Sequence, residues 1–229
     1  MFQTKIPLYG ICILISFIFG LGVIFIHSKE LKISLEYRFY LIFLAFFGGI
    51  CGAKYYTYFT NLDQYQNHFN FFQIGFSSLG AVIGILIMMY FYSRMLKIKY
   101  EKMLEVVLPS IPLMYAIGKI GCFLAGCCYG IEYHGLFSIV YHYSIEAPNG
   151  ISLFPVQIFE TIVFLILYII IEWMHIRNVG VIMTSCGVCK FVLDFLRHGR
   201  TSFLTINQVV CFIFILIGIV IIYQKRKNI

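Results

Sequence analysis

The chain has 229 residues, of which 61% are hydrophobic and only 12% are charged, and its mean hydropathy is +0.89. Soluble globular domains average about 45–50% apolar and about 25% charged residues, so the composition excludes a soluble enzyme, a nucleic-acid-binding module and a disordered tail. The net charge of +7 is informative only through the positions of the basic residues. The long apolar runs lack the alternation of polar and apolar residues that is typical of a transmembrane β-barrel. We therefore predict an all-α polytopic membrane protein.

Seven apolar segments are long enough to cross a bilayer, which takes about 20 helical residues. The first exceeds the core of a typical signal peptide and precedes no evident cleavage site, so we expect it to be retained. Glycine and serine enrich residues 73–84, and Pro109 and Pro112 interrupt the fourth segment. We predict a single integral membrane domain over residues 1–229, with spans near 7–26, 39–59, 75–92, 105–124, 154–173, 178–196 and 207–223.

Lysine and arginine gather on one side of these spans. The segments after the first, third and fifth spans, together with the C-terminal tail, hold eleven basic residues, whereas the opposite side holds three. Short cytoplasmic segments carry the excess of Lys and Arg in membrane proteins. We therefore predict a multi-pass cell-membrane protein with its N-terminus outside and its C-terminus in the cytoplasm.

Five ionisable residues lie inside or at the edges of the predicted spans: Lys54, Lys119, Glu160, Lys190 and Asp194. A charge within a bilayer is costly unless it is paired or lies in a watery cavity. Each residue alone is compatible with snorkelling to the interface or with a structural ion pair. Because they cluster toward the outer halves of the fourth, fifth and sixth spans, we favour a shared polar cavity.

A segment rich in glycine and cysteine follows the fourth span, GKIGCFLAGCCYG at residues 118–130. Its small residues permit close helix packing, and Lys119 offers a cation suited to a phosphate. The segment resembles the signature of bacterial prolipoprotein diacylglyceryl transferases, roughly G-R-I-G-N-F-I-N-G-E-x-Y/W-G. Further segments match motifs of that family in the same order: IPLYG at 6–10, GGICGAKYY at 48–56, FPVQIFE at 154–160, KFVLDFLR at 190–197 and LTINQ at 204–208.

The chain also departs from the family's motifs, so we identify it as a divergent member with a cysteine-rich signature. Exchange of arginine for lysine loses the bidentate geometry that suits a phosphate. The changed positions are Lys119 for arginine, Cys122 for asparagine, Cys127 for glutamate, Leu79 for histidine, and Lys190 with Asp194 for an arginine–glutamate pair.

The resemblance implies the family's seven-span bundle and its reaction, in which the diacylglyceryl group of phosphatidylglycerol moves to the thiol of a lipoprotein-precursor cysteine and glycerol phosphate leaves. Cations would stabilise the departing phosphate, and a carboxylate would act as base or would orient a cation. The catalytic candidates are Lys119, Glu160, Asp194, Arg197, Cys127 and Cys122, and the substrate-binding candidates are Tyr9, Gly121, Gly126, Tyr129, Gln157, Lys190, Arg200 and Lys54.

The eight cysteines fall mostly within apolar stretches and do not form a secreted disulfide framework. On a continuous helix Cys122 and Cys127 would lie about 140° apart and would not share a face. Cys127 and Cys128 are adjacent at a span end, and Cys186 and Cys189 are one helical turn apart. Three interpretations remain open, namely apolar packing, a redox or acyl-carrying thiol, and a metal site. We favour packing and predict no metal and no cofactor.

The leading functional hypothesis is an outer-leaflet enzyme whose partners are a phospholipid, with phosphatidylglycerol favoured, and a secreted lipoprotein precursor or another thiol acceptor. One alternative is an inactive or repurposed relative, which the altered signature would explain. The other is a small transporter, which would call for discontinuous helices and ligands near the bilayer midplane. No nucleic-acid partner is expected.

Overall fold

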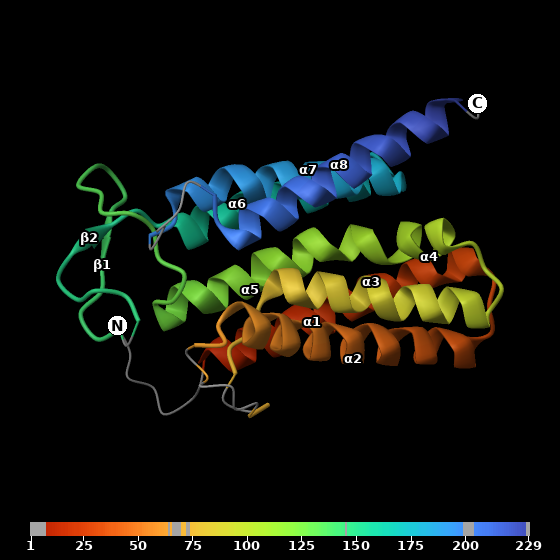
Figure 1. Cartoon of the computed structure of the whole chain (residues 1–229), viewed down its shortest axis with the longest axis horizontal. Coiled ribbons are helices and arrows are strands. Elements are labelled where there is room, and N and C mark those ends of the chain that lie inside the picture. The colour runs from red at the N-terminus through yellow and green to blue at the C-terminus, as the bar shows by residue number, and fades with distance from the viewer. Residues whose placement is uncertain are drawn as a thin grey trace. The chain divides into compact units, whose positions relative to one another are not determined.

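The computed structural model describes residues 8–63, 65, 70–71, 74–144, 146–198 and 204–227. Within them the chain is mainly helical, with one short antiparallel pair of strands, β1 and β2 (Figure 1). The elements are α1 (Leu8–His27), η1 (Ser28–Leu31), α2 (Leu35–Thr60), α3 (Ser78–Met95), α4 (Tyr100–Val107), η2 (Leu108–Ser110), α5 (Ile111–Ala125), β1 (Ile139–Val140), β2 (Ser152–Leu153), α6 (Val156–Trp173), α7 (Val179–Leu193), η3 (Asp194–Leu196) and α8 (Ile206–Lys227).

Seven helical segments of the described chain are long and apolar enough to cross a membrane. This finding confirms the predicted all-α membrane class and the number of spans, with bounds that differ by a few residues. The third span begins at Ser78, later than predicted, because the side chain of Ser77 caps α3 by accepting the N–H of Gly80 at 3.4 Å. The fourth span runs through α4, η2 and α5, and its prolines lie at the junctions between these helices.

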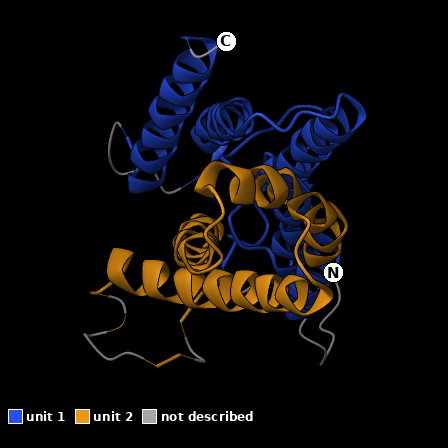
Figure 2. Ribbon diagram, turned by 90° about the vertical axis from the view of Figure 1, so that its right-hand side faces the viewer, with its two compact units in different colours: residues 1–20, 112–229 blue, residues 21–111 orange. Residues whose placement is uncertain are grey.

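The chain forms two compact units (Figure 2). Unit 1 comprises residues 1–20 and 112–229, and unit 2 comprises residues 21–111. The division falls within α1 and at the first residue of α5. Unit 1 therefore contains the cysteine-rich segment and α6 to α8, whereas unit 2 contains α2 to α4.

In unit 2, α2 and α3 approach each other through glycines. A methyl group added at Gly84 would collide with the carbonyl oxygen of Gly48, and one at Gly52 would collide with the carbonyl oxygen of Gly80. Small residues allow backbones to pack closely in a membrane, where apolar side chains gain little by leaving lipid. The GGICG segment thus holds α2 against α3.

We expect Gly84→Ala to destabilise the protein by about 1–3 kcal/mol, the usual cost of overpacking. The colliding atom is a backbone oxygen, which cannot rotate away, so the two helices must separate. Thermal unfolding in detergent, followed by loss of helical circular dichroism, measures the effect. Gly22→Ala is the matched control, because a methyl group at Gly22 meets no atom within 4 Å; equal melting temperatures for the two variants would contradict the packing argument.

In unit 1, a segment outside the spans connects α5 to α6 and contains β1 and β2. Tyr141, Ala147 and Leu153 form its small buried cluster. The backbone of Gly130 pairs with that of Arg197, and Ile131 N–H donates to the carbonyl of Leu196 at 3.0 Å. These bonds tie the end of the cysteine-rich segment to the end of α7, so the two candidate motifs lie side by side.

Candidate active site

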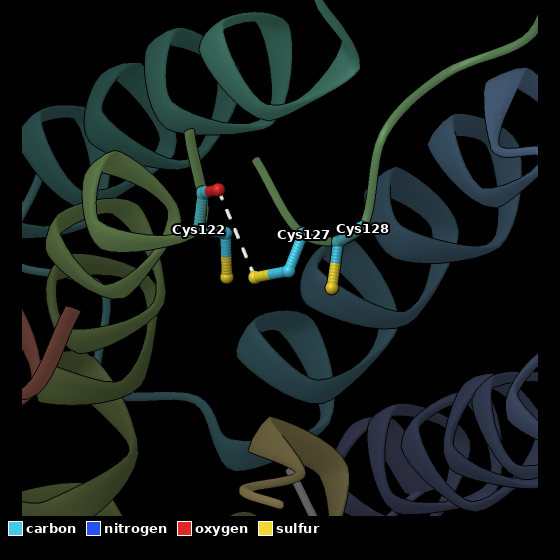
Figure 3. A group of neighbouring side chains, drawn as sticks. All are labelled: Cys122, Cys127 and Cys128. Carbon is cyan, nitrogen blue, oxygen red and sulfur yellow. Dashed lines mark hydrogen bonds between the residues drawn. The ribbon is translucent and has the colours of Figure 1, made fainter. Parts of the chain in front are cut away.

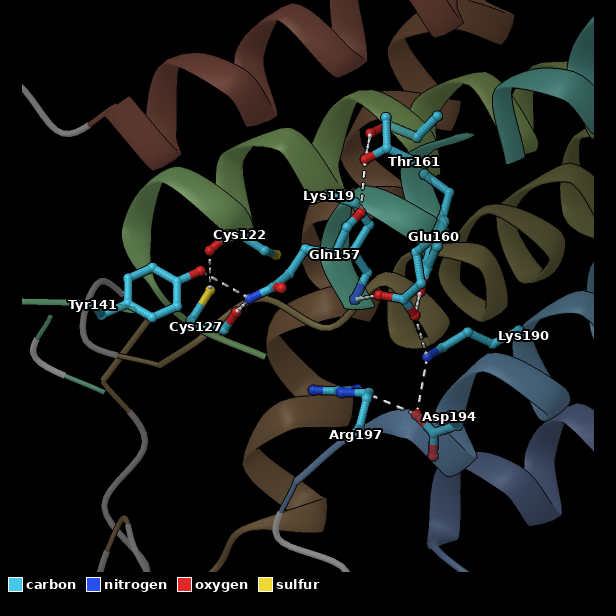
Figure 4. A network of polar contacts seen from close by, with 12 residues as sticks. Lys119, Cys122, Cys127, Tyr141, Gln157, Glu160, Thr161, Lys190, Asp194 and Arg197 are labelled. Atoms are coloured by element: carbon cyan, nitrogen blue, oxygen red, sulfur yellow. Dashed lines mark hydrogen bonds and ion pairs between the residues drawn. The ribbon is translucent and has the colours of Figure 1, made fainter. Parts of the chain in front are cut away.

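A buried network of charged side chains joins α5, α6 and α7 in unit 1 (Figure 4). Lys119 lies on α5, Glu160 on α6, and Lys190 and Asp194 at the end of α7 and the start of η3. All four residues are at most 5% exposed. The structure thus brings together the charges that the sequence places inside the fourth, fifth and sixth spans.

Glu160 is the centre of this network. Its Oε1 accepts hydrogen bonds from Tyr115 Oη at 2.6 Å and from Lys190 Nζ at 2.9 Å. Its Oε2 pairs with Lys119 Nζ at 2.6 Å. Both lysine ammonium groups also lie over the ring of Tyr115, 5.2 Å and 5.8 Å from its centre. One fully buried carboxylate therefore fixes the positions of two cations.

Asp194 extends the network toward the start of α8. Lys190 Nζ lies 3.0 Å from Asp194 Oδ1, a pairing that the i, i+4 spacing on one helical face favours. Arg197 Nη1 lies 3.4 Å from the same oxygen, and Thr205 Oγ1 donates to Oδ2 at 2.9 Å.

The LTINQ segment positions that threonine through a capping box. Gln208 N–H donates to Thr205 Oγ1 at 3.1 Å, and Thr205 N–H donates to Gln208 Oε1 at 3.0 Å. This reciprocal pair satisfies backbone donors at the start of α8. It also leaves the hydroxyl proton of Thr205 available to Asp194, so the motif has a local structural role that also serves the network.

The network carries one more positive charge than negative, because Lys119, Lys190 and Arg197 face two carboxylates. Of these side chains Arg197 is the most exposed, at 23%. Buried charges are stable only when they are paired and hydrogen-bonded. The arrangement therefore favours an anion of a single negative charge beside it.

Three thiols gather where α5 ends (Figure 3). The Sγ atoms of Cys122, Cys127 and Cys128 all lie within 4.8 Å of one another. The expectation that Cys122 and Cys127 do not share a face is wrong, because α5 ends at Ala125 and the chain turns at Gly126 with φ +73°. Cys128 also has a positive φ, +56°, a conformation that is costly for a residue other than glycine.

Gln157 and Tyr141 hold this turn in place. The buried amide of Gln157 donates to the carbonyl of Cys127 at 2.9 Å, and its Nε2 lies 3.4 Å from Tyr141 Oη. Tyr141 Oη in turn donates to the carbonyl of Phe123 at 3.3 Å. Since Gln157 and Glu160 lie on the same face of α6, that helix contacts both the backbone of the cysteine-rich turn and the charged network (Figure 4).

The thiols differ in acidity because they interact with one another and with the cations. Hydrogen bonds with Cys122 and Cys127, together with the positive charges of Lys119 and Arg197, lower the pKa of Cys128 well below its usual value. Hydrogen bonds with the other two thiols raise the pKa of Cys127. The positive charges of Lys119 and Arg197 thus favour the thiolate form of Cys128.

The other predicted site residues are placed as follows. Tyr9 lies against Gly121, whose missing side chain leaves room for Cys12. The ring of Tyr129 stacks on that of His198, with ring centres 5.1 Å apart.

Lys54 belongs to unit 2, where its ammonium group donates to the carbonyl of Ile74 at 2.5 Å. Arg200 lies outside the described residues.

Cys186 and Cys189 do not join the thiol group. They pack against an apolar cluster that contains Ala116, Phe164 and Leu193. Their spacing is that of neighbouring residues on one helical face, and apolar packing accounts for them.

Four residues of the site were not among the sequence-based candidates. One is Cys128, which directly follows the candidate Cys127 and joins the thiol group. Tyr115 lies one turn before Lys119 on α5, so the helical periodicity places both side chains on one face and could have indicated Tyr115. Thr205 stands within a matched motif, and its T-x-x-Q spacing is that of a capping box. Tyr141 lies in the segment between α5 and α6, and no pattern in the sequence indicates its contact with Gln157.

Comparison with known proteins gives consistent matches. A family model described as prolipoprotein diacylglyceryl transferase matches residues 1–224. A phosphatidylglycerol–prolipoprotein diacylglyceryl transferase of Clostridium tetani is 29% identical, and the match covers 99% of this chain and 96% of the relative. The phosphatidylglycerol–prolipoprotein diacylglyceryl transferase 2 of Clostridium perfringens is 30% identical, and the match covers 99% of this chain and 93% of the relative. The transferase of Methylococcus capsulatus is 27% identical, and the match covers 82% of this chain and 78% of the relative. The chain therefore belongs to the prolipoprotein diacylglyceryl transferase family.

Proposed function

We propose that this protein transfers the diacylglyceryl group of phosphatidylglycerol to the thiol of a cysteine in a lipoprotein precursor. Its relatives carry the name of that reaction over nearly the whole length of the chain. The observation that carries the proposal is the network in which three cations, Lys119, Lys190 and Arg197, pair with the carboxylates of Glu160 and Asp194. The membership of a transferase family does not favour the alternative of a small transporter.

The excess positive charge of the network suits the lipid phosphate, which carries one negative charge. Lys119 supplies a point charge and Arg197 a planar fork, and together they match a group with several acceptor oxygens. Attack on the glyceryl carbon breaks its bond to a phosphate oxygen, so negative charge grows on the leaving glycerol phosphate. Cations held in place beforehand stabilise that charge in the transition state.

The two carboxylates act in this proposal as positioning residues. Both oxygens of Glu160 are already engaged by Tyr115, Lys119 and Lys190, which favours orientation of cations over proton removal. Asp194 orients Lys190 and Arg197 in the same way. Gln157 and Gly126 shape the turn that carries Cys127, next to which the acceptor thiol would lie.

The test is to incubate the purified full chain in detergent with phosphatidylglycerol and a peptide that contains the precursor cysteine. Mass spectrometry should detect the peptide with one added diacylglyceryl group, and glycerol phosphate should appear in equal amount. A peptide with serine in place of that cysteine is the control and should stay unmodified. If the cysteine peptide also stays unmodified, the proposal fails and the chain is a repurposed relative.

We propose that the seven-span chain resides in the bacterial cell membrane with its N-terminus outside. The eleven-to-three distribution of basic residues supports this orientation. We likewise propose that residues 1–229 form one integral membrane domain, since the boundary between the two units falls inside the continuous helix α1.

A fusion experiment tests the orientation. Green fluorescent protein attached after residue 229 should fluoresce, and alkaline phosphatase attached there should be inactive, because the C-terminus is expected in the cytoplasm. Alkaline phosphatase fused after Gly150, between the fourth and fifth spans, should be active. The reverse pattern at these two positions would contradict the proposed topology.

A further inference from the structure

The thiol group at the end of α5 has a composition that apolar packing does not explain. Three Sγ atoms from one short segment lie within 4.8 Å of one another (Figure 3). The residues sit at a turn with two positive φ values, at Gly126 and Cys128, and the buried Gln157 fixes the carbonyl of Cys127. If the thiols only packed against apolar neighbours, the strained backbone would cost folding free energy, and the hydrogen bond from Gln157 that holds it would serve no purpose.

The spacing of the sulfurs suits a thiophilic metal ion. Zinc binds thiolates at about 2.3 Å, so that sulfurs on a tetrahedral ion lie about 3.8 Å apart. The observed limit of 4.8 Å is within reach of small side-chain rotations.

In the part of the chain that the structure describes, this group holds three ligands and not four. Structural zinc sites are closed by four protein ligands, whereas catalytic sites use three and leave one position open. We propose that Cys122, Cys127 and Cys128 bind one Zn²⁺ ion and that the open position takes the acceptor cysteine of the precursor, an inference that rests on the transferase function proposed above.

The reaction needs a thiolate near neutral pH, and a thiol bound to zinc is deprotonated. On binding, the acceptor thiol releases its proton to solvent. The sulfur then attacks the glyceryl CH₂ carbon, so that the C–S bond forms as the C–O bond to phosphate breaks. The electron pair of that C–O bond leaves with glycerol phosphate. The thioether product is neutral and binds zinc weakly, so it dissociates, and no oxidant or reductant is consumed.

The first experiment measures metal binding without reference to activity. The full chain, purified in detergent with a reductant that does not bind metals, should hold one zinc per chain by inductively coupled plasma mass spectrometry. Replacement by Co²⁺ should give the near-ultraviolet charge-transfer absorption of cobalt thiolates. The cysteine peptide should increase that absorption, because a further thiolate joins the ion, whereas the serine peptide should not change it.

Variants then assign the ligands. Cys122→Ser, Cys127→Ser and Cys128→Ser should each lower zinc affinity at least about 100-fold, beyond the 10–100-fold typical of changes around a site. Cys186→Ser and Cys189→Ser are the matched controls and should keep zinc, because these thiols pack in an apolar cluster. Cys128→His, which keeps a ligand at that position, should retain metal and shows that loss in Cys128→Ser does not come from misfolding.

The results separate this inference from the proposed function. If zinc is absent and the chelated protein transfers lipid at the full rate, the metal site is wrong and the transferase function stands. If zinc binds through the three cysteines but no variant or wild-type protein transfers lipid, the function is wrong and the metal site stands. If the cysteine peptide leaves the cobalt spectrum unchanged while zinc is bound, the assignment of the open position to the acceptor thiol is overturned.

Discussion

Lys119→Ala is expected to lower the rate of diacylglyceryl transfer about 10²–10³-fold, the effect of removing one preorganised group that stabilises transition-state charge. Lys119 is buried on α5 and pairs with Glu160 at 2.6 Å, so its ammonium group is fixed before the substrate binds. The loss should appear mainly in kcat, since the negative charge grows on the phosphate only as the C–O bond breaks. Mass spectrometric product counts over time give the rate.

A conservative substitution of Lys119 and a substitution of Arg197 test this prediction further. Lys119→Arg should keep much of the activity, because it restores the residue found in the family signature. Arg197→Ala should also slow transfer, because Arg197 is the second cation assigned to the phosphate. Lys119→Ala should keep its zinc and its helical circular dichroism. Full activity in both Lys119→Ala and Arg197→Ala would show that the phosphate binds elsewhere.

Glu160→Gln is expected to destabilise the protein by about 3–5 kcal/mol, the usual cost of removing one partner from a buried ion pair. The glutamine keeps the shape of the side chain but leaves Lys119 without its counter-charge and Lys190 with Asp194 alone. The excess charge of the buried network doubles as a result. Thermal unfolding in detergent measures the loss, and transfer activity should fall with it.

Two controls isolate the electrostatic cause. Glu132→Gln removes a carboxylate whose side chain is 65% exposed, so its melting temperature should stay close to that of the wild-type protein. The double variant Lys119→Gln with Glu160→Gln should be more stable than Glu160→Gln alone, because it removes the unpaired cation, and it should remain inactive. Additive effects of the two substitutions would mean that the residues do not interact.

Composition, apolar run length and motif order are enough to assign the class of the fold, the number of spans and the family. The length of an apolar run decides whether a segment can cross a bilayer, because the helix must span the hydrocarbon core. The segment must be helical because its backbone groups find no hydrogen-bond partners in lipid. The cost of burying charge also marked Lys119, Glu160, Lys190 and Asp194 as residues that need partners. The order of the matched motifs indicates the family without reference to geometry.

Which of these residues contact one another depends on the packing of helices that are distant in the sequence. Helical periodicity relates residues on one helix, but Glu160 joins groups from α5, α6 and α7 that are far apart in the sequence. The cysteines show the same limit, since the periodicity argument assumed that α5 continues to Cys127, whereas the helix ends at Ala125 and the turn at Gly126 brings the sulfurs together. Where a helix ends depends on contacts made outside it, here those of Gln157 and Tyr141, and such contacts leave no periodic trace in the sequence.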